Sequence, residues 1–151
     1  MASVAAKNDE FEELNTQILS ISTDSVYTHK IWNEQELSKI LGDNIPFPMM
    51  SDRTGDIGRM YGVYNEETGT EVRGRFIIDP DGIIQAYEVL NPPVGRNVAE
   101  GLRQLRAFQY VRESGGTEVM PAGWQPGKKT LRPRPELVGN VWREWTVQDA
   151  F

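Results

Sequence analysis

Residues 72–110 read VRGRFIIDPDGIIQAYEVLNPPVGRNVAEGLRQLRAFQY, and this stretch decides the fold. The apolar run at 73–78 predicts a strand, and the DPDG segment at 79–82 predicts a tight turn. In such a turn proline presets φ, aspartate caps the backbone, and glycine accepts a positive φ. Residues 82–90 then continue as the returning strand, so the sequence predicts a β-hairpin.

A helix is expected directly after the hairpin, over residues 97–114. Its apolar side chains recur at helical spacing and lie on or near one face. They are Val98, Leu102, Leu105, Ala107, Phe108 and Val111. A strand pair followed by a long amphipathic helix is typical of a layered domain, in which the helix covers one face of a sheet.

Helices and strands alternate upstream of the hairpin. The spacing predicts a helix over 3–15, a strand over 17–22, and a helix that ends near Ile40 with Gly42 at its C-cap. A short strand at 49–50 and a helix capped by Ser51-Asp52 follow, with Ile57, Met60 and Tyr61 expected to face inward. This order predicts an α/β domain with a mixed sheet.

The C-terminal part has a different composition. After Gly115-Gly116 the chain is rich in proline and glycine, and residues 117–151 are expected to form an extended arm. Trp124, Trp142 and Trp145 of this arm should be exposed unless another part of the protein covers them. The sequence therefore predicts a core over 1–116 and a C-terminal arm over 117–151.

Composition excludes several classes of function. The 151 residues carry 16 Lys and Arg against 22 Asp and Glu, a net charge of −6, which disfavours nonspecific nucleic-acid binding. No apolar run approaches the roughly 20 residues that a membrane span needs. The first ten residues do not resemble a signal peptide, so the cytoplasm is the expected location. The absence of cysteine excludes disulfides, thiolate metal sites and a cysteine nucleophile within these residues.

Few residues suggest a metal or cofactor site. His29 is the only histidine, and no carboxylates stand at a metal-binding spacing from it, so a capping or packing role is preferred. Glycines at 55, 58 and 62 do not form a phosphate-binding loop, because no G-K-[ST] follows them. No metal and no cofactor are therefore expected.

Three arginines are more informative. Arg73 and Arg75 flank the start of the predicted strand, and Arg96 precedes the long helix. The simplest interpretation of such residues is a surface or ion-pair role. Their functional use would be a fixed cationic fork that polarises an oxygen substrate or lowers the pKa of a thiol. The residues alone leave the function of this α/β domain open.

Three motifs in one order change this interpretation. They are SISTDSVYTHKIW at 20–32, the hairpin and helix at 72–110, and TEVMPAGWQPGKKTLRP at 117–133. Together they resemble the peroxiredoxin family of alkyl hydroperoxide reductases and thioredoxin peroxidases, of the typical two-cysteine kind. The resemblance implies a thioredoxin-like fold and an antioxidant activity, the thiol-dependent reduction of hydrogen peroxide and alkyl hydroperoxides.

The chain departs from the family at both catalytic cysteines. In the family the peroxidatic cysteine lies in a P-x-x-x-T-x-x-C motif at the first turn of the helix that opens this chain, and the sequence begins just after it. Met120 occupies the place of the resolving cysteine. By motif, Arg73 and Arg96 match the two family arginines that bind substrate. The resemblance thus implies a substrate site without a catalytic residue.

A central strand of the family's sheet is missing as well. About five buried side chains at roughly 1.5–3 kcal/mol each would be lost with it, on the order of 10 kcal/mol. That loss is comparable with the whole stability of a domain, roughly 5–15 kcal/mol. The isolated chain is therefore expected to be marginally stable.

Two hypotheses about function follow. In the first, the locus encodes a one-cysteine-type peroxidase of which this sequence is an incomplete version. The chain is then inactive by itself until a cysteine is supplied; only then would it use peroxide and a thiol reductant. In the second, the chain is a noncatalytic oligomer subunit or partner-binding module. A third possibility combines these two hypotheses: the chain is the back half of a split peroxidase whose front half is another chain. In either case a homo-oligomer, at least a dimer, is expected through the edge strand at 83–90 and the arm.

Overall fold

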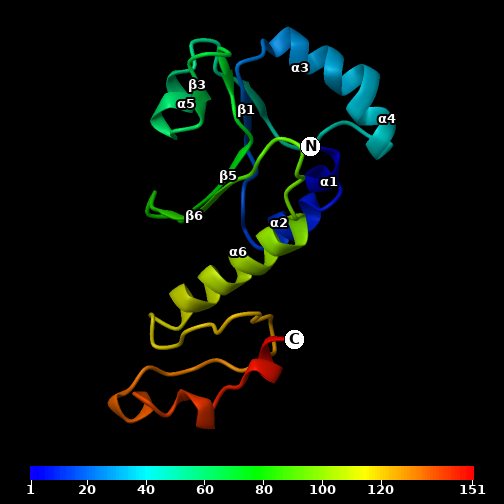
Figure 1. Ribbon diagram of the computed structural model, residues 1–151. Helices are drawn as coiled ribbons and strands as arrows, with labels where there is room; N and C mark the ends of the chain where they lie inside the picture. Colours follow the sequence, from blue (N-terminus) through cyan, green and yellow to red (C-terminus); the bar gives the residue numbers. More distant parts are fainter. The chain divides into compact units, whose positions relative to one another are not determined.

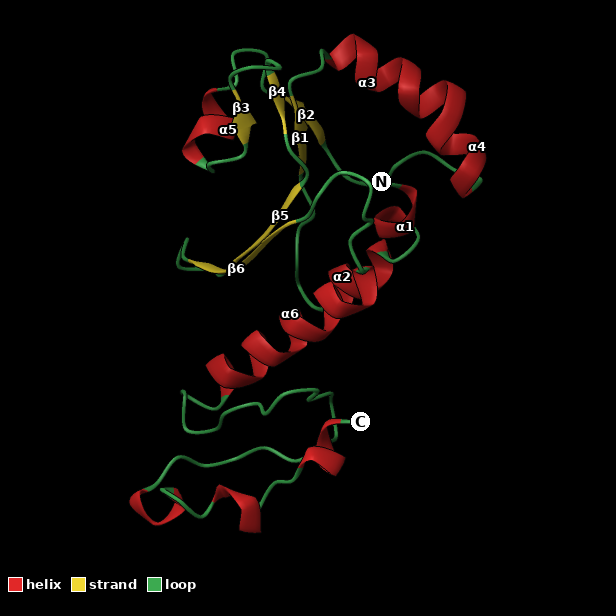
Figure 2. Cartoon of the chain, viewed as in Figure 1, coloured by secondary structure: helices red, strands yellow, loops and turns green.

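A computed structural model describes all residues, 1–151, as an α/β chain with two compact units. The first unit comprises Met1–Val98 and contains all six strands, while the second comprises Ala99–Phe151. Figures 1 and 2 show how helices, strands and loops follow one another along the chain. The predicted division into 1–116 and 117–151 remains a prediction.

The first predicted helix is broken into two. Helix α1 spans Ala2–Ala5 and α2 spans Asn8–Glu13, so the single helix expected over 3–15 is wrong. The break lies at Lys7, whose φ of −116° is not helical. Neither N-cap side chain accepts a hydrogen bond from the helix, and such short uncapped helices gain little from backbone bonding.

The next helical segment connects two parallel strands. Strand β1 (Ser20–Ser22) pairs in parallel with β2 (Met49–Ser51). Between them run α3 (Val26–Trp32), the π-helical turn η1 (Asn33–Leu37) and α4 (Ser38–Leu41). The Ser25 hydroxyl caps α3 by accepting a hydrogen bond from the amide of Thr28, and Gly42 ends α4 with φ 85°. The predicted C-cap is confirmed.

His29 has the packing role that its sequence context predicts. It is buried, and its Nδ1 lies 3.2 Å from the carbonyl oxygen of Met49, while its Nε2 lies 2.7 Å from the hydroxyl of Ser22. Because a carbonyl only accepts, Nδ1 carries the ring proton and Nε2 accepts from Ser22. The histidine thus joins α3 to both strands of the parallel pair.

A small module follows β2. It consists of α5 (Asp56–Met60) and the antiparallel pair of β3 (Tyr64–Asn65) and β4 (Thr70–Glu71). Arg59 links its parts, because its guanidinium donates to both carboxylate oxygens of Glu66 at 2.6 and 3.0 Å and lies 4.1 Å from the centre of the Tyr64 ring. Met60 is 79% exposed, so its predicted inward orientation is wrong: α5 is too short to bury more than one side.

The predicted hairpin is confirmed. Strands β5 (Gly74–Ile78) and β6 (Ile84–Val89) pair antiparallel. At the turn, Oδ1 of Asp79 accepts hydrogen bonds from the amides of Asp81 and Ile83, each at 2.9 Å, and Gly82 has φ 80°.

The six strands do not join into one sheet. They form three separate pairs, β1-β2, β3-β4 and β5-β6. No side chain in the chain falls below 2% exposure, and the β6 side chain of Tyr87 is 73% exposed. This arrangement agrees with a sheet that lacks a strand between its halves, as the resemblance implies.

The second unit is held together around a buried carboxylate. Helix α6 (Val98–Glu113) is followed by an arm with the 3-10 turns η2 (Pro135–Leu137), η3 (Val141–Arg143) and η4 (Val147–Ala150). Glu118 is buried and accepts hydrogen bonds from Tyr110, Thr130 and Arg132. The bonds from Thr130, Arg132 and Tyr110 outweigh burial and lower the pKa of Glu118, so its contribution to stability is lost only at acidic pH.

The arm is less exposed than its composition predicts. Trp124 is only 3% exposed, since its ring lies 5.6 Å from that of Tyr110 and its indole nitrogen donates to the carbonyl of Lys128. Trp142 is 66% exposed. The arm therefore covers one of its tryptophans itself.

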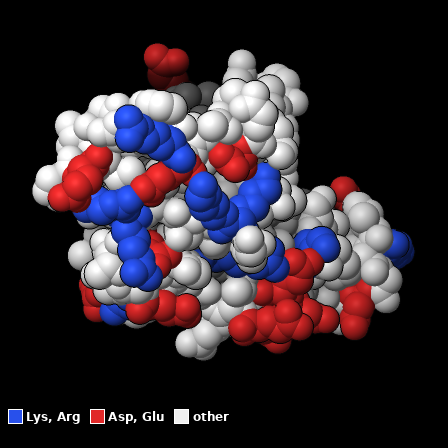
Figure 3. Space-filling model, turned by 90° about the horizontal axis from the view of Figure 1, so that it is seen from below, with Lys and Arg blue, Asp and Glu red and all other residues white.

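No helix of the structure combines the length and the apolar character that a membrane crossing requires. On the face seen in Figure 3, acidic and basic side chains lie next to one another.

We expect the isolated 151-residue chain to unfold with a free energy below about 5 kcal/mol, because two strand pairs that should share one sheet stand apart. Urea titration followed by circular dichroism measures this value. A compact monomer with a steep, cooperative transition and a higher free energy would contradict the expectation.

Replacing Trp124 by alanine should cost about 3–5 kcal/mol, because its ring is buried against Tyr110. Because the chain is expected to be only marginally stable, that loss should unfold the arm and remove its near-ultraviolet circular dichroism. The matched control is Trp142→Ala, which removes an exposed ring and should leave the signal of the arm in place. Equal effects of the two variants would show that Trp124 is not a packing centre.

Candidate functional site

Three arginines connect the start of β5 with the loop that precedes α6. Arg73 donates to the carbonyl of Pro92 at 3.5 Å, and Arg75 donates to the carbonyl of Asn97 at 3.0 Å. In the opposite direction, Arg96 donates to the carbonyl of Gly74. The structure thus brings together both arginines predicted from the motifs, with Arg75 between them.

Arg73 lies at a bend of the backbone. The amide of Gly74 donates to the carbonyl of Val72 at 3.0 Å, which closes a three-residue turn around Arg73. The amide of Val72 in turn donates to the carbonyl of Val63 at 2.7 Å. The backbone that carries this guanidinium is therefore tied down on both sides, while the side chain itself is exposed.

The cluster carries excess positive charge. Desolvation of its guanidinium lowers the pKa of Arg96, and the neighbouring charges of Arg75 and Arg73 lower it further, while Glu88 acts in the opposite sense. Glu88 lies 3.3 Å from Arg75 and directly opposite it in the hairpin register. One carboxylate faces three guanidinium groups, so the site favours an anion or a developing negative charge.

The start of the chain lies at this cluster. Burial lowers the pKa of the Met1 amino group, and the charges of Arg96 and Arg73 lower it further. The hydroxyl of Ser20 in β1 lies 3.6 Å from the sulfur of Met1. Met1 is therefore close both to β1 and to the arginines at the start of β5.

The cluster can bind and polarise an oxygen substrate but holds no group that attacks it. A guanidinium presents several N–H donors in a fixed plane, which suits a peroxide or an oxyanion. The chain contains no cysteine, and no group of three or more His, Asp or Glu side chains is placed to hold a metal ion. The geometry is that of a cationic cluster that suits an anion or an oxygen ligand.

Met120 belongs to the second unit. It is half-buried and follows Val119, which pairs with Leu131 through two backbone hydrogen bonds. A thioether has no thiolate form and cannot condense with a sulfenic acid.

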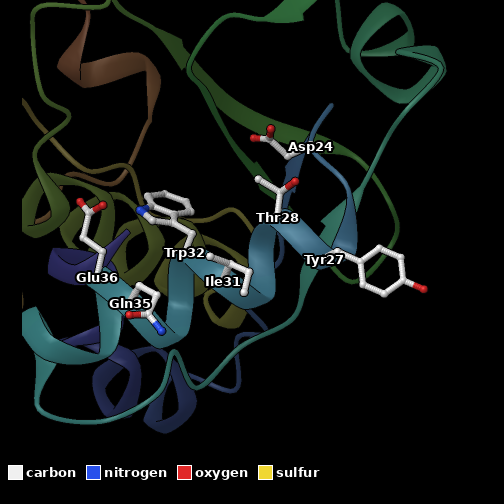
Figure 4. A pocket seen from close by; sticks show the side chains of 7 residues that line it. All are labelled: Asp24, Tyr27, Thr28, Ile31, Trp32, Gln35 and Glu36. Carbon is white, nitrogen blue, oxygen red and sulfur yellow. The ribbon is translucent and has the colours of Figure 1, made fainter.

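A shallow hollow of about 760 Å³ lies elsewhere in the first unit. Figure 4 shows its lining on α3 and η1, with Tyr27 projecting outward. Its lining residues are Asp24, Tyr27, Thr28, Ile31, Trp32, Gln35 and Glu36. None of the three arginines lines it, so it is separate from the candidate site.

Glu88 is a part of the cluster that the sequence analysis did not identify. Counting back from the DPDG turn would place Tyr87 opposite Arg75, but a register shift between Ile77 and Ile78 places Glu88 there instead. Opposite charges at such positions pair across strands.

The chain thus combines an α/β fold with a cluster of three arginines that suits anionic or oxygen-rich ligands. Comparison of the sequence with models of known protein families shows the family. The AhpC/TSA family matches residues 1–87, and the C-terminal domain of 1-Cys peroxiredoxin matches residues 107–146. The chain belongs to the AhpC/TSA family of peroxiredoxins.

Individual relatives agree. The chain is 61% identical over 151 residues to the selenocysteine-containing peroxiredoxin PrxU of Peptoclostridium acidaminophilum, covering all of this chain and 74% of that protein. It is 44% identical over 131 residues to the chloroplastic 2-Cys peroxiredoxin BAS1 of Hordeum vulgare, covering 86% of this chain and 61% of that protein. The chain thus spans only part of the relatives that it matches.

Solved structures confirm the thioredoxin-like α/β fold. The reduced 2-Cys peroxiredoxin of Plasmodium vivax superposes with a TM-score of 0.82 at 36% identity, covering 89% of this chain and 68% of that one. The AhpC of Enterococcus faecalis superposes with a TM-score of 0.70 at 36% identity, covering 76% of this chain and 66% of that one.

Proposed function

We propose that this chain is the arginine-bearing part of a peroxidase that reduces hydrogen peroxide and alkyl hydroperoxides. Its nucleophile is supplied by residues ahead of Met1. One observation carries the proposal: hydrogen bonds bring Arg73, Arg75 and Arg96 together where β5 begins, and the charges of Arg96 and Arg73 reach the amino group of Met1 and lower its pKa. A residue shortly before Met1 would therefore lie at the site that binds the peroxide.

The chemistry needs a deprotonated chalcogen. The thiolate or selenolate attacks one peroxide oxygen, the O–O bond breaks, and a sulfenic or selenenic acid forms while hydroxide or alkoxide leaves. Guanidinium donors of Arg73 and Arg96 would stabilise both the anionic nucleophile and the leaving oxygen. Because Met120 cannot form a disulfide, we propose that an external thiol condenses with the oxidised group, which releases water and leaves a mixed disulfide or selenenyl sulfide. A second external thiol then displaces the nucleophile and leaves as the oxidised disulfide.

We propose selenocysteine as the nucleophile, with cysteine as the alternative. The support is the 61% identical relative that is named as selenocysteine-containing, of which about a quarter lies outside the aligned residues. A selenol is more acidic than a thiol and is ionised at neutral pH, so it needs less help from the arginines. This chain without its nucleophile is expected to be inactive.

We also propose that the protein forms a dimer through the outer edge of β6 and the C-terminal arm. The edge of β6 away from β5 has no strand partner, and Ile84, Tyr87 and Val89 on this strand are exposed. An unpaired, apolar edge strand is a template for pairing with a second chain. A noncatalytic subunit would use the same surfaces, and a cytoplasmic location is proposed for either form.

A chimaera tests the proposed activity. The residues of the PrxU relative that precede its aligned part, with cysteine replacing any selenocysteine among them, are joined ahead of Met1, and peroxide-dependent oxidation of dithiothreitol is measured. The chimaera should consume peroxide, whereas the 151-residue chain should show only the uncatalysed rate. An inactive but folded chimaera would contradict the proposal.

Arginine variants of the chimaera test the site. Arg96→Lys and Arg73→Lys keep the charge but lose the planar donors, so each should lower the second-order rate constant with peroxide by about tenfold or more. The control is Arg143→Lys, whose guanidinium stacks on the exposed Trp142 in the arm. Unchanged rates in all three variants would remove Arg73 and Arg96 from the site.

A further inference from the structure

We propose that the carboxyl groups of Asp52 and Glu71 share one proton and form a pH-sensitive clamp that fixes the backbone leading to Arg73. The clamp is closed while Glu71 is protonated and opens when Glu71 ionises. It joins the loop before α5 to strand β4, and it is separate from the arginine cluster.

The two acidic side chains meet at the first turn of α5. Asp52 is only 5% exposed, and its Oδ2 accepts a hydrogen bond from the amide of Gly58 at 2.8 Å. Glu71 packs against the same glycine so closely that a Cβ at position 58 would lie 2.7 Å from Oε1 of Glu71. This oxygen is buried and has no hydrogen-bond partner. Two carboxyl groups at one glycine, away from water, cannot both carry a charge cheaply.

No basic side chain neutralises the pair. Of the charged groups on the surrounding elements, Arg59 of α5 is engaged with Glu66 of the β3-β4 turn and lies 3.6 Å from Asp56. Burial raises the pKa of Glu71, and the neighbouring Asp52 raises it further. A shared proton is the remaining way to relieve the repulsion.

Asp52 keeps its charge in this arrangement. Burial alone would raise the pKa of Asp52, but the hydrogen bonds from the Gly58 amide, Glu71 and the next amides of α5 outweigh it and lower the pKa. Glu71 is therefore the proton carrier. Its stabilising effect is fully present below its pKa in the unfolded chain and is lost as the pH rises through the raised pKa in the folded chain. Asp52 has the opposite sign: its effect is lost at acidic pH.

The clamp acts on the segment that carries Arg73. Glu71 is the last residue of β4, and the next residue, Val72, bonds to Val63 before the bend at Arg73. This short segment has two anchors, the backbone hydrogen bond of Val72 to Val63 and the contact of Glu71 with Asp52. Opening the Asp52–Glu71 contact releases the second of them. Glu71 is thus a positioning residue, since it does not itself reach the arginine cluster.

Carbon-13 NMR of the carboxyl groups in this chain tests the clamp without any nucleophile. Glu71 should titrate above the ordinary glutamate range. The protection of the Gly58 amide against hydrogen exchange should fall by about tenfold or more as it does so. In Glu71→Gln the side-chain amide donates to Asp52 at every pH, so the protection should stay flat through the same interval. Glu67→Gln, in the exposed turn, should behave as the unmodified chain.

The variant Gly58→Ala tests the contact between Asp52 and Glu71 independently. The added methyl group must displace Glu71, which should return the Glu71 titration to the ordinary glutamate range. An ordinary titration of Glu71 in the unmodified chain, or a Gly58 amide that is unprotected at every pH, would overturn the proposal. None of these outcomes depends on peroxidase activity, so the proposed function and the clamp fail separately.

Discussion

Backbone pairing is the constraint on which the rest of this structure depends. Strand β1 is bonded to β2 along one edge and β5 to β6 along one edge, while the other edge of β1 and of β5 has no strand. In a complete thioredoxin-like sheet a central strand satisfies both edges. Without it, these strand edges stay unpaired, and no side chain falls below 2% exposure.

The candidate site lies at the same gap. Arg73 and Arg75 stand at the start of β5, Arg96 reaches back to the carbonyl of Gly74, and Met1 lies close to both β1 and the arginines. The strand that the resemblance implies and the proposed nucleophile would therefore come from one neighbouring segment. In this proposal the stability of the sheet and the chemistry depend on the same segment, because the arginines offer hydrogen-bond donors to an anion while the chain contains no cysteine.

The sequence predicted those features that short-range chemistry determines. The hairpin follows from the DPDG turn, the end of α4 from Gly42, and the role of His29 from its helix context. Motif order predicted Arg73 and Arg96 as substrate-binding residues; the structure brings them together, and their role stays a prediction. Other features depend on tertiary contacts that periodicity does not encode. The break at Lys7, the exposure of Met60 and the burial of Trp124 are of this kind, as is the approach of Glu71 to Asp52 across Gly58.

The intact mass of the protein captured from its source cells tests the central claim most directly. Our account predicts a mass well above the 17.1 kDa of these 151 residues, with an N-terminal peptide that contains selenocysteine or cysteine. The isotope pattern of selenium would distinguish the two. A mass equal to that of the 151 residues would contradict the account and leave a noncatalytic member of the family, whose partner chain would then be sought.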